Sequence, residues 1–333
     1  MVHLRIVVPN HQSGHALDLL ENTPSVCNLI YLERVARKPE GDVILCDVAR
    51  EDASVIISDL RELEIDKEGS IAIEEIDSQI SEVAIQAEKA AAGLPSDAVV
   101  WEEVESRTQE NVELSASFLA FMVVATLIAA VGILTDQLVL IIGAMVVGPE
   151  FGPLAGLCVA LVHKRGDLVR RSLKALVVAF PVAIAATLLL TLLLDATTLV
   201  PDSFSQDGHP FTEFISDPDY FSVIVAVLAG IAGVLSLTST KSGALVGVLI
   251  SVTTIPAAAN IGVAAALGDS EVAGAAAQLA INLTAIVLAG VSTLFLQRLL
   301  YVRRRRAHLQ SHAREEAGLP LGHSRRQPKP ADE

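Results

Sequence analysis

Six long apolar stretches follow residue 112 of this chain, at residues 114–134, 137–162, 168–194, 219–238, 243–267 and 272–300. A helix needs about 20 residues to cross the hydrocarbon core of a bilayer, and each stretch is long enough. Such stretches cannot all be buried inside a soluble domain of ordinary size. We therefore predict a multi-pass membrane domain of six transmembrane helices over residues 113–302, with the lipid bilayer as its partner.

The charges between the stretches indicate their direction. One set of connections is basic: Lys164, Arg165, Arg170, Arg171 and Lys174, then Lys241, then Arg303–Arg306. The alternate connections carry acidic residues such as Asp136, Asp195 and Asp269 and contain no lysine or arginine. Since basic loops stay on the cytoplasmic side, we expect both termini in the cytoplasm and the protein in the plasma membrane.

The chain is acidic as well as apolar, with 39 Asp and Glu against 24 Lys and Arg. Residues 1–112 hold 23 of these acidic groups and only 9 of the basic ones, so the negative charge lies ahead of the membrane domain. A surface of this sign repels phosphate backbones, and we expect no nucleic-acid partner. Abundant acid with scarce lysine also suggests a halophilic source.

Residues 1–78 have the pattern of a small α+β domain. Strands are expected at 2–9, 26–36, 42–48 and 70–77, and helices at 12–22 and 51–65, from their periods of two and 3.6. The order βαββαβ is that of the ferredoxin-like unit, so we predict a cytoplasmic ferredoxin-like domain.

The loop between the first strand and helix of this domain is polar and contains glycine. It comprises Asn10, His11, Gln12, Ser13, Gly14 and His15. Backbone N–H groups at a helix start can receive an anionic effector, and two histidines four residues apart suit a metal. An ordinary capped turn explains the same residues. We predict no metal site and no cofactor.

Two segments flank the membrane domain. Residues 79–112 are predicted to form a helical linker, with Ile80, Val83, Ala84 and Ala87 as one apolar stripe, packed on the head, a neighbouring subunit or the membrane surface. Residues 303–333 are basic and rich in Gly, Pro and charge, so a disordered cytoplasmic tail is expected.

The second and fifth apolar stretches contain residues that disrupt helices. The second has Gly148, Pro149, Gly152 and Pro153, and the fifth has Pro256. Proline removes a backbone donor and clashes with the preceding turn. We predict that both helices are broken, which at membrane depth requires neighbouring protein or a wet cavity.

The two stretches also resemble each other. Ile142-Gly143 matches Val246-Gly247, and Pro153 matches Pro256, at spacings of about one hundred residues. Residues 114–194 and 219–300 then form two units of three helices that enter from opposite sides. Such a 3+3 inverted repeat with paired broken helices is typical of secondary transporters, although small residues and prolines also recur in membrane helices for packing.

Four segments of the chain read AAVGILTDQLVLIIGAM, GPEFGP, SGALVGVLISVTTIPAAANIG and QLAINLTAIVLAG, in this order. Together they resemble a family of membrane proteins known as domain of unknown function 389. The resemblance implies a cytoplasmic N-terminal domain and a multi-helix membrane domain, and it implies no substrate. The chain departs from the family pattern at Glu150, where apolar residues are usual, and at Pro256, where two adjacent prolines are frequent.

Glu150 is the one carboxylate well inside an apolar stretch. A charge at mid-bilayer costs about 2.5–3.5 kcal/mol on insertion scales, so Glu150 is a candidate ion or proton site. It equally suits the cap of a half-helix that starts near Phe151. Further candidates for ion or substrate binding are Thr253, Thr254, Asn260 and Asn282, which instead could satisfy neighbouring backbone groups.

These features favour a transporter or channel for an ion or small solute, with the head as a regulatory or oligomerising module in a homo-oligomer. The alternative is a membrane-anchored sensor or scaffold whose head binds an effector or partner. The sequence has no paired carboxylates, activated nucleophile, phosphate loop or zinc spacing, so we do not expect an enzyme.

Overall fold

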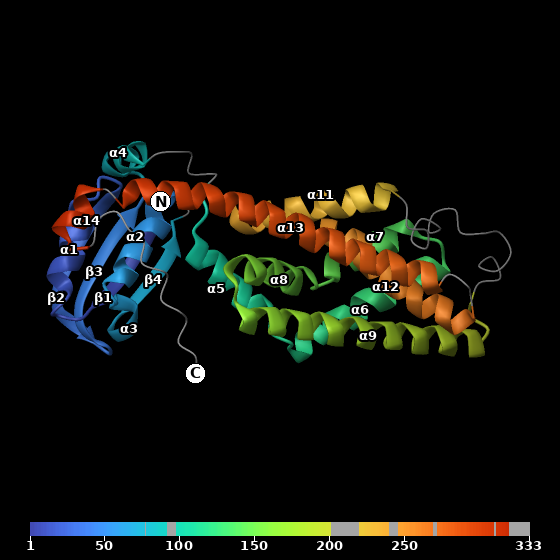
Figure 1. Ribbon diagram of the computed structural model, residues 1–333. Helices are drawn as coiled ribbons and strands as arrows, with labels where there is room; N and C mark the ends of the chain where they lie inside the picture. The colour runs from blue at the N-terminus through green and yellow to red at the C-terminus, as the bar shows by residue number, and fades with distance from the viewer. Residues whose placement is uncertain are drawn as a thin grey trace. The chain divides into compact units, whose positions relative to one another are not determined.

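The computed structural model describes residues 1–76, 78–91, 98–200, 220–239, 246–268, 272–309 and 311–319, and within these ranges it excludes the side chains of 246–253, 304 and 307. The chain divides into two compact units. The first consists of Met1–Val104 and Gln297–Glu333, and the second of Glu105–Leu296 (Figure 1). Each unit is considered by itself below.

The first unit contains a four-stranded antiparallel sheet with the strand order β2-β3-β1-β4. Its elements are β1 (Val2–Val8), α1 (Ser13–Glu21), β2 (Val26–Arg37), β3 (Glu40–Val48), α2 (Arg50–Glu62), α3 (Ile65–Glu68) and β4 (Ser70–Glu75). The predicted order of four strands and two helices is thus observed, with α3 added. The predicted helix 51–65 ends early because Glu64 adopts a left-handed conformation, with φ of 60°.

One face of the sheet forms the core of this unit with α1 and α2. Alternate residues of β1 point to this face, and Val2, Leu4, Ile6 and Val8 are all 0% exposed. They belong to the same cluster as Leu19 of α1 and as Ile56 and Leu60 of α2. The period of two in the strands and of 3.6 in the helices therefore does position the core as the sequence indicates.

The linker region contains α4 (Glu82–Ala90) and α5 (Trp101–Asn111). Ser81 caps α4, since its hydroxyl accepts a hydrogen bond from the N–H of Ala84 at 3.3 Å. Ala84 and Ala87 are buried against Cys27, but Ile80 and Val83 are exposed. The predicted apolar stripe of this helix is therefore only half covered.

All six predicted apolar stretches contain helix. The second unit comprises α6 (Ala116–Leu134), α7 (Leu138–Val147), α8 (Phe151–His163), α9 (Gly166–Ala196), α11 (Tyr220–Thr238), α12 (Val246–Leu267) and most of α13 (Val272–His308). Among the described residues, four helices are long and apolar enough to span a membrane, namely α6, α9, α11 and α13. The bent pair α7 and α8 makes a fifth if it counts as one span. These helices are those of a multi-pass membrane protein.

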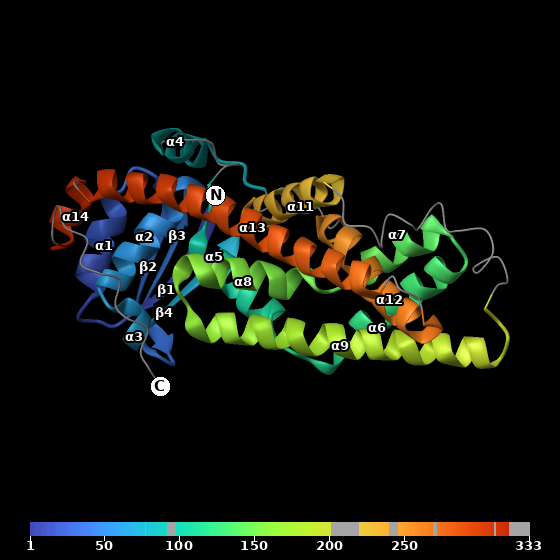
Figure 2. The same ribbon diagram turned by 45° about the vertical axis from the view of Figure 1, so that its right-hand side comes forward.

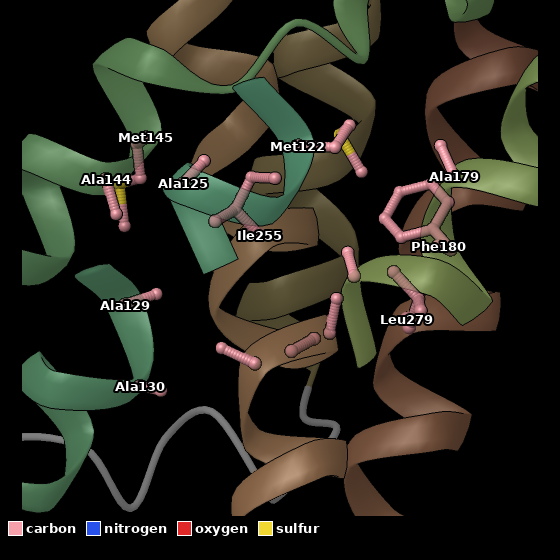
Figure 3. Packing of buried hydrophobic residues seen from close by; sticks show 14 of the residues in the cluster. Met122, Ala125, Ala129, Ala130, Ala144, Met145, Ala179, Phe180, Ile255 and Leu279 are labelled. Carbon is pink, nitrogen blue, oxygen red and sulfur yellow. The ribbon is translucent and has the colours of Figure 1, made fainter. Parts of the chain in front are cut away.

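α12 lies at the centre of the second unit. It contacts α6, α7, α9 and α11, and every side chain from Thr254 to Asn260 is buried. Figure 3 shows Ile255 of α12 near Met122 and Ala125 of α6, in a cluster that also contains Phe180 of α9 and Leu279 of α13. Small residues permit the close approach, because a Cβ at Gly262 would lie 2.9 Å from the carbonyl oxygen of Ile184.

The predicted break in the fifth stretch is wrong, because α12 continues as helix through Pro256. α9 likewise continues through Pro181. One proline removes a single helical N–H, and surrounding helices can compensate for that loss within a membrane domain. The second stretch, with two prolines and two glycines in six residues, does break.

The predicted disordered tail is also wrong for its described part. α13 continues to His308, which Figure 2 shows as one long helix, and α14 (His312–Glu316) follows. Ala313, Ala317 and Leu319 are buried in the core cluster of the first unit. Residues 320–333 of the expected tail lie outside the described residues.

Candidate functional site

The break in the second apolar stretch is the centre of the candidate site. α7 ends at Val147, α8 begins at Phe151, and the two helices are bent by 53°. Gly148 is extended, with ψ of 125°, as is usual for a residue before proline. Of the predicted break residues, Gly148 and Pro149 form the break itself. Gly152 and Pro153 lie in the first turn of α8. Proline lacks a backbone N–H, but an N–H in the first turn has no partner within the helix, so its loss there does not break the helix.

Glu150 occupies the cap position of α8, but its side chain makes no capping hydrogen bond. Its backbone carbonyl accepts from the N–H of Leu154 at 3.2 Å. The carboxylate points elsewhere: Oε1 accepts a hydrogen bond of 2.8 Å from the hydroxyl of Thr254 on α12. The predicted cap is therefore not formed by the side chain of Glu150, which instead joins two helices of the second unit.

Both partners of this contact are 0% exposed. The side chain of Ile255, next to Thr254, is in the apolar cluster of the unit, so the carboxylate lies in surroundings of low polarity. In such surroundings a carboxylate binds a cation or a proton strongly, since little water competes for it. The other predicted threonine, Thr253, has its side chain outside the described part of the structure.

The predicted asparagines are buried on two different helices. Asn260 is 5% exposed on α12, and Asn282 is 0% exposed on α13. Asn282 has a neighbour that sequence reasoning missed, because the amide of Gln278 approaches its Oδ1 at 3.5 Å and is 4% exposed. An amide one helical turn before a buried asparagine in an apolar stretch is the signal that identifies it.

A recess of about 440 Å³ reaches the break. Its wall consists of Glu110, Asn111, Glu113, Ser115, Phe118, Val146, Gly148, Pro149, Phe151 and Gly152. The residues from the turn between α5 and α6 are mostly exposed, and Glu110 and Glu113 bring two acidic groups to it. A Cβ at Gly152 would lie 2.6 Å from the carbonyl oxygen of Asn111, so only glycine lets this turn approach α8.

The loop proposed for an effector in the first unit has a structural role. Ser13 donates a hydrogen bond to Asp42, which also accepts from the hydroxyl of Tyr31 at 2.8 Å and the N–H of Arg34 at 2.7 Å. Burial would raise the pKa of Asp42, but these three hydrogen bonds outweigh it and hold that pKa below its ordinary value. These contacts hold the loop in a fixed turn, although Gln12 at the cap position of α1 makes no side-chain capping hydrogen bond.

The remaining residues of this loop agree with that structural role. α1 begins at Ser13, so His11 precedes the helix and does not share a helical face with His15. The ring of His15 lies 3.6 Å from where a Cβ at Gly318 would be, next to the C-terminal segment. Asn10 lies in the turn, and Gly14 has open space around it. The described residues contain no group of three or more His, Cys, Asp or Glu suited to a metal.

Comparison with known proteins agrees with these features. Residues 145–288, from the end of α7 to the middle of α13, match the model of the family described as domain of unknown function (DUF389). An uncharacterized protein of Methanocaldococcus jannaschii is 28% identical over 204 residues, which are 57% of this chain and 58% of that protein. The match thus spans little more than half of the relative.

No solved structure matches this chain. The family match includes the helix break, Glu150, Thr254, Asn260 and Asn282, but not the part of the recess wall from Glu110 to Phe118. The resemblance predicted from the sequence is confirmed over residues 145–288, which are similar to domain of unknown function 389.

Proposed function

We propose that this protein transports a cation, or a solute coupled to a proton or cation, across the plasma membrane, with binding at Glu150 and Thr254. The observation that carries the proposal is the hydrogen bond of 2.8 Å between these two fully buried side chains. An ionisable group inside a membrane domain is costly and usually marks a pathway for an ion or a proton.

The spacing of the two residues supports an inverted repeat. Glu150 and Thr254 are 104 residues apart, and Ile142-Gly143 and Val246-Gly247 of the two halves have the same separation. In a domain with two inverted halves, residues near the pseudo-two-fold axis meet their own counterparts. A contact between equivalent positions is therefore what a 3+3 repeat with a central site would produce.

The recess next to the break supports a cation rather than an anion. Glu110 and Glu113 line it together with Gly148 and Pro149 of the break. Acidic groups at the mouth of a recess raise the local concentration of cations and lower that of anions. A cation that enters here reaches Gly148 and Pro149, which precede Glu150 in the chain, and the break supplies backbone that is not committed to a helix.

Flux through purified protein in liposomes tests the proposal. The panel includes protons, Na⁺, K⁺ and amino acids, each with the wild-type chain and with Glu150→Gln. We expect flux of a cation, or of a solute driven by one, and its loss of at least tenfold in Glu150→Gln. The matched control is Thr126→Val, because Thr126 is equally buried but bonds only its own helix at Met122 and Val123.

Two results would reject this function. One is the absence of flux for every solute by protein that is folded and inserted. The other is flux that Glu150→Gln leaves at the wild-type rate, which would remove Glu150 from the pathway.

A sensor is the second candidate, because the head and the last membrane helix are physically joined. α13 is continuous from Val272 to His308, and Arg305 near its end pairs with Glu62 of α2 at 2.7 Å. A ligand on the head would act on α13 through this pair. Flux that is absent in every assay, together with a ligand-dependent change in the head, would favour this candidate.

A further inference from the structure

The end of α5 has one buried face. Residues 105–111 of α5 belong to the second unit, together with Val112, which follows directly. Thr108 and Val112 are each 1% exposed, whereas Ser106 and Glu110, on the other side of the helix, are exposed. Positions four apart lie on one helical face, so Thr108 and Val112 are directed at the same neighbour.

This neighbour is α8, and two glycines permit its close approach. A Cβ at Gly156 would overlap Cγ2 of Val112 and lie 3.3 Å from Cγ2 of Thr108. One turn earlier, a Cβ at Gly152 would lie 2.6 Å from the carbonyl oxygen of Asn111. Glycines four residues apart present bare backbone on one side of a helix, where another segment packs closely. The end of α5 therefore packs on the first half of α8.

An ion pair holds α5 near the other end of α8. Arg165, which follows α8, pairs with Glu105 of α5 and, at 3.2 Å, with Asp167 of α9. The side chains of Arg165 and Glu105 are 28% and 23% exposed. Water competes for the charges of a partly exposed pair, so the pair contributes little to stability and breaks readily. The pair of Glu105 and Arg165 therefore has the character of a reversible latch.

The packed arrangement leaves one buried hydroxyl unsatisfied. Ser172 of α9 is 0% exposed, and its Oγ would lie 3.0 Å from a Cβ at Gly156, where Thr108 and Val112 also meet α8. This hydroxyl has no hydrogen-bond partner among the described residues. A buried hydroxyl without a partner is unfavourable, and water would bond it if α5 moved away. Ser172 therefore favours release of α5.

The end of α5 also lies where the recess meets the helix break. Glu110 and Asn111 line the recess together with Gly148 and Pro149 of the break. Glu150, the next residue, is nevertheless 0% exposed. The recess thus stops short of the carboxylate, and Asn111 closes on the first turn of α8. Movement of the end of α5 away from α8 would widen the recess beside Glu150.

We infer that the end of α5 is an inhibitory cover on α8, latched by Glu105 and Arg165. In the observed arrangement the cover is closed. Release of the latch lifts the end of α5, hydrates Ser172 and opens the recess toward Glu150. The inference rests on the proposed function, since an opening beside Glu150 regulates transport only if Glu150 is in the pathway.

Labelling of Ser172→Cys tests whether the cover moves. Cysteine is close to serine in size, and the purified full-length protein in detergent is treated with a maleimide. The natural cysteines Cys27, Cys46 and Cys158 are buried, and the wild-type chain gives the background. We expect slow labelling of Ser172→Cys, which the addition of Glu105→Gln accelerates severalfold because the latch is weakened.

The matched control for the latch is Asp167→Asn. It removes the other carboxylate partner of Arg165 and leaves the pair with Glu105 intact, so labelling should stay slow. Glu105→Arg alone should label fast, and Glu105→Arg with Arg165→Glu should label slowly again. Labelling that Glu105→Gln does not accelerate would overturn the inference. If the exchanged pair stays fast while its thermal unfolding matches that of the wild type, Glu105 and Arg165 are not the latch.

Gly156→Ala releases the cover without a change of charge. The added Cβ would overlap Val112, so the end of α5 must move away and labelling of Ser172→Cys should accelerate. Gly143→Ala is the control, because a Cβ there has nothing within 4 Å. Equal labelling rates for the two alanine variants would mean that α5 does not yield, which contradicts a movable cover.

Flux in liposomes tests whether the cover regulates transport. We expect Glu105→Gln and Gly156→Ala to raise flux severalfold, and Asp167→Asn and Gly143→Ala to leave it at the wild-type rate. Faster labelling with unchanged flux would show that α5 moves without controlling the pathway, and would overturn the inference. Flux that is absent from every chain would instead reject the proposed function, while the labelling rates still report whether α5 moves.

Discussion

At the scale of single residues, the contact between Glu150 and Thr254 is the basis for the function proposed for the membrane unit. The hydroxyl of Thr254 donates a hydrogen bond to the buried carboxylate of Glu150, and this hydrogen bond is lost when the hydroxyl is removed. Leaving a buried acceptor without its donor costs about 1–3 kcal/mol, and more for a charged group. Glu150 thus contributes to the stability of the membrane unit as well as to the proposed transport pathway. Substitutions at Glu150 and Thr254 distinguish the two contributions.

Thr254→Val keeps the shape of the side chain and removes the donor at 2.8 Å from Glu150. We expect a loss of roughly 1–3 kcal/mol in the free energy of unfolding, measured in detergent by thermal unfolding. Glu150→Gln retains an acceptor oxygen and should change stability by less than about half as much. Thr126→Val serves as the control, because its hydroxyl bonds its own helix. A Thr126→Val loss as large as that of Thr254→Val would contradict the special role of the Glu150 contact.

Asp47 makes the free energy of unfolding of the first unit depend on pH. Burial would raise the pKa of Asp47, but hydrogen bonds from Asn28, His3 and Gln79 outweigh it and hold that pKa below its ordinary 3.8. The folded state therefore binds this proton less readily than the unfolded state. The contribution is complete well above pH 3.8 and is lost as the pH falls through 3.8 to the folded value.

The fluorescence of Trp101, the one tryptophan and a buried residue of the first unit, reports this unfolding. Asp47→Asn should lower stability at neutral pH and flatten its decline below about pH 4. Glu21→Gln, at an exposed carboxylate, should leave the profile unchanged. A wild-type decline that Asp47→Asn does not alter would assign the acid sensitivity to other groups.

At the scale of elements, the second and fifth apolar stretches show what can be predicted from the sequence. Gly148 precedes Pro149, and both favour extended backbone, so the break there followed from local preference. Pro256 has the same local effect, yet α12 is helical because neighbours on every side hold it. The contact of Glu150 with Thr254 depends on that packing. Glu150 and Thr254 were identified as candidates from the sequence, but their pairing could not be.

In the first unit, the C-terminal segment likewise makes contacts that could not be predicted from the sequence. Its arginines suggested a free basic tail, and composition alone could not locate their partners. Arg314 and Asp59 are both 0% exposed and pair with each other, and Arg314 also pairs with Glu62 at 2.7 Å. His308 of α13 lies 3.0 Å from Asp59 as well. The segment is held by a buried ion-pair network.

Breaking this network should release the segment. Arg314→Ala leaves the buried Asp59 with less compensation, and removing one partner of a buried pair typically costs about 3–5 kcal/mol. We expect a lower unfolding temperature of the first unit, followed by Trp101, whose ring is 6.2 Å from that of Tyr301 on α13. Arg306→Ala removes an exposed arginine and should have little effect. Equal effects of the two substitutions would mean that the network contributes nothing specific.

At the scale of the whole molecule, the first unit limits how many times the chain crosses the membrane. It contains both the N-terminal domain and the end of α13, which are linked by Arg305 and Arg314 to Asp59 and Glu62. We therefore expect both ends of the membrane region to lie on one side of the bilayer, which requires an even number of crossings. α12 has 22 residues, which is about 33 Å of helix and enough to cross. If α12 crosses, the bent pair of α7 and α8 must cross too, which gives six.

Labelling of single added cysteines from outside intact cells decides between a crossing and a re-entrant pair. If α7 and α8 cross together, Glu21→Cys in the head and Ser205→Cys, between α9 and α11 in the sequence, are separated by three crossings and lie on opposite sides. If the pair returns to the side it entered from, only α6 and α9 separate them, and both lie on the same side.

We expect an impermeant maleimide to label Ser205→Cys in intact cells and Glu21→Cys only after permeabilisation, because the basic residues near Lys164 favour the side of the head. The wild-type chain, with its three buried cysteines, is the control. Protection of both added cysteines in intact cells would make the pair re-entrant and would exclude the six-helix inverted repeat.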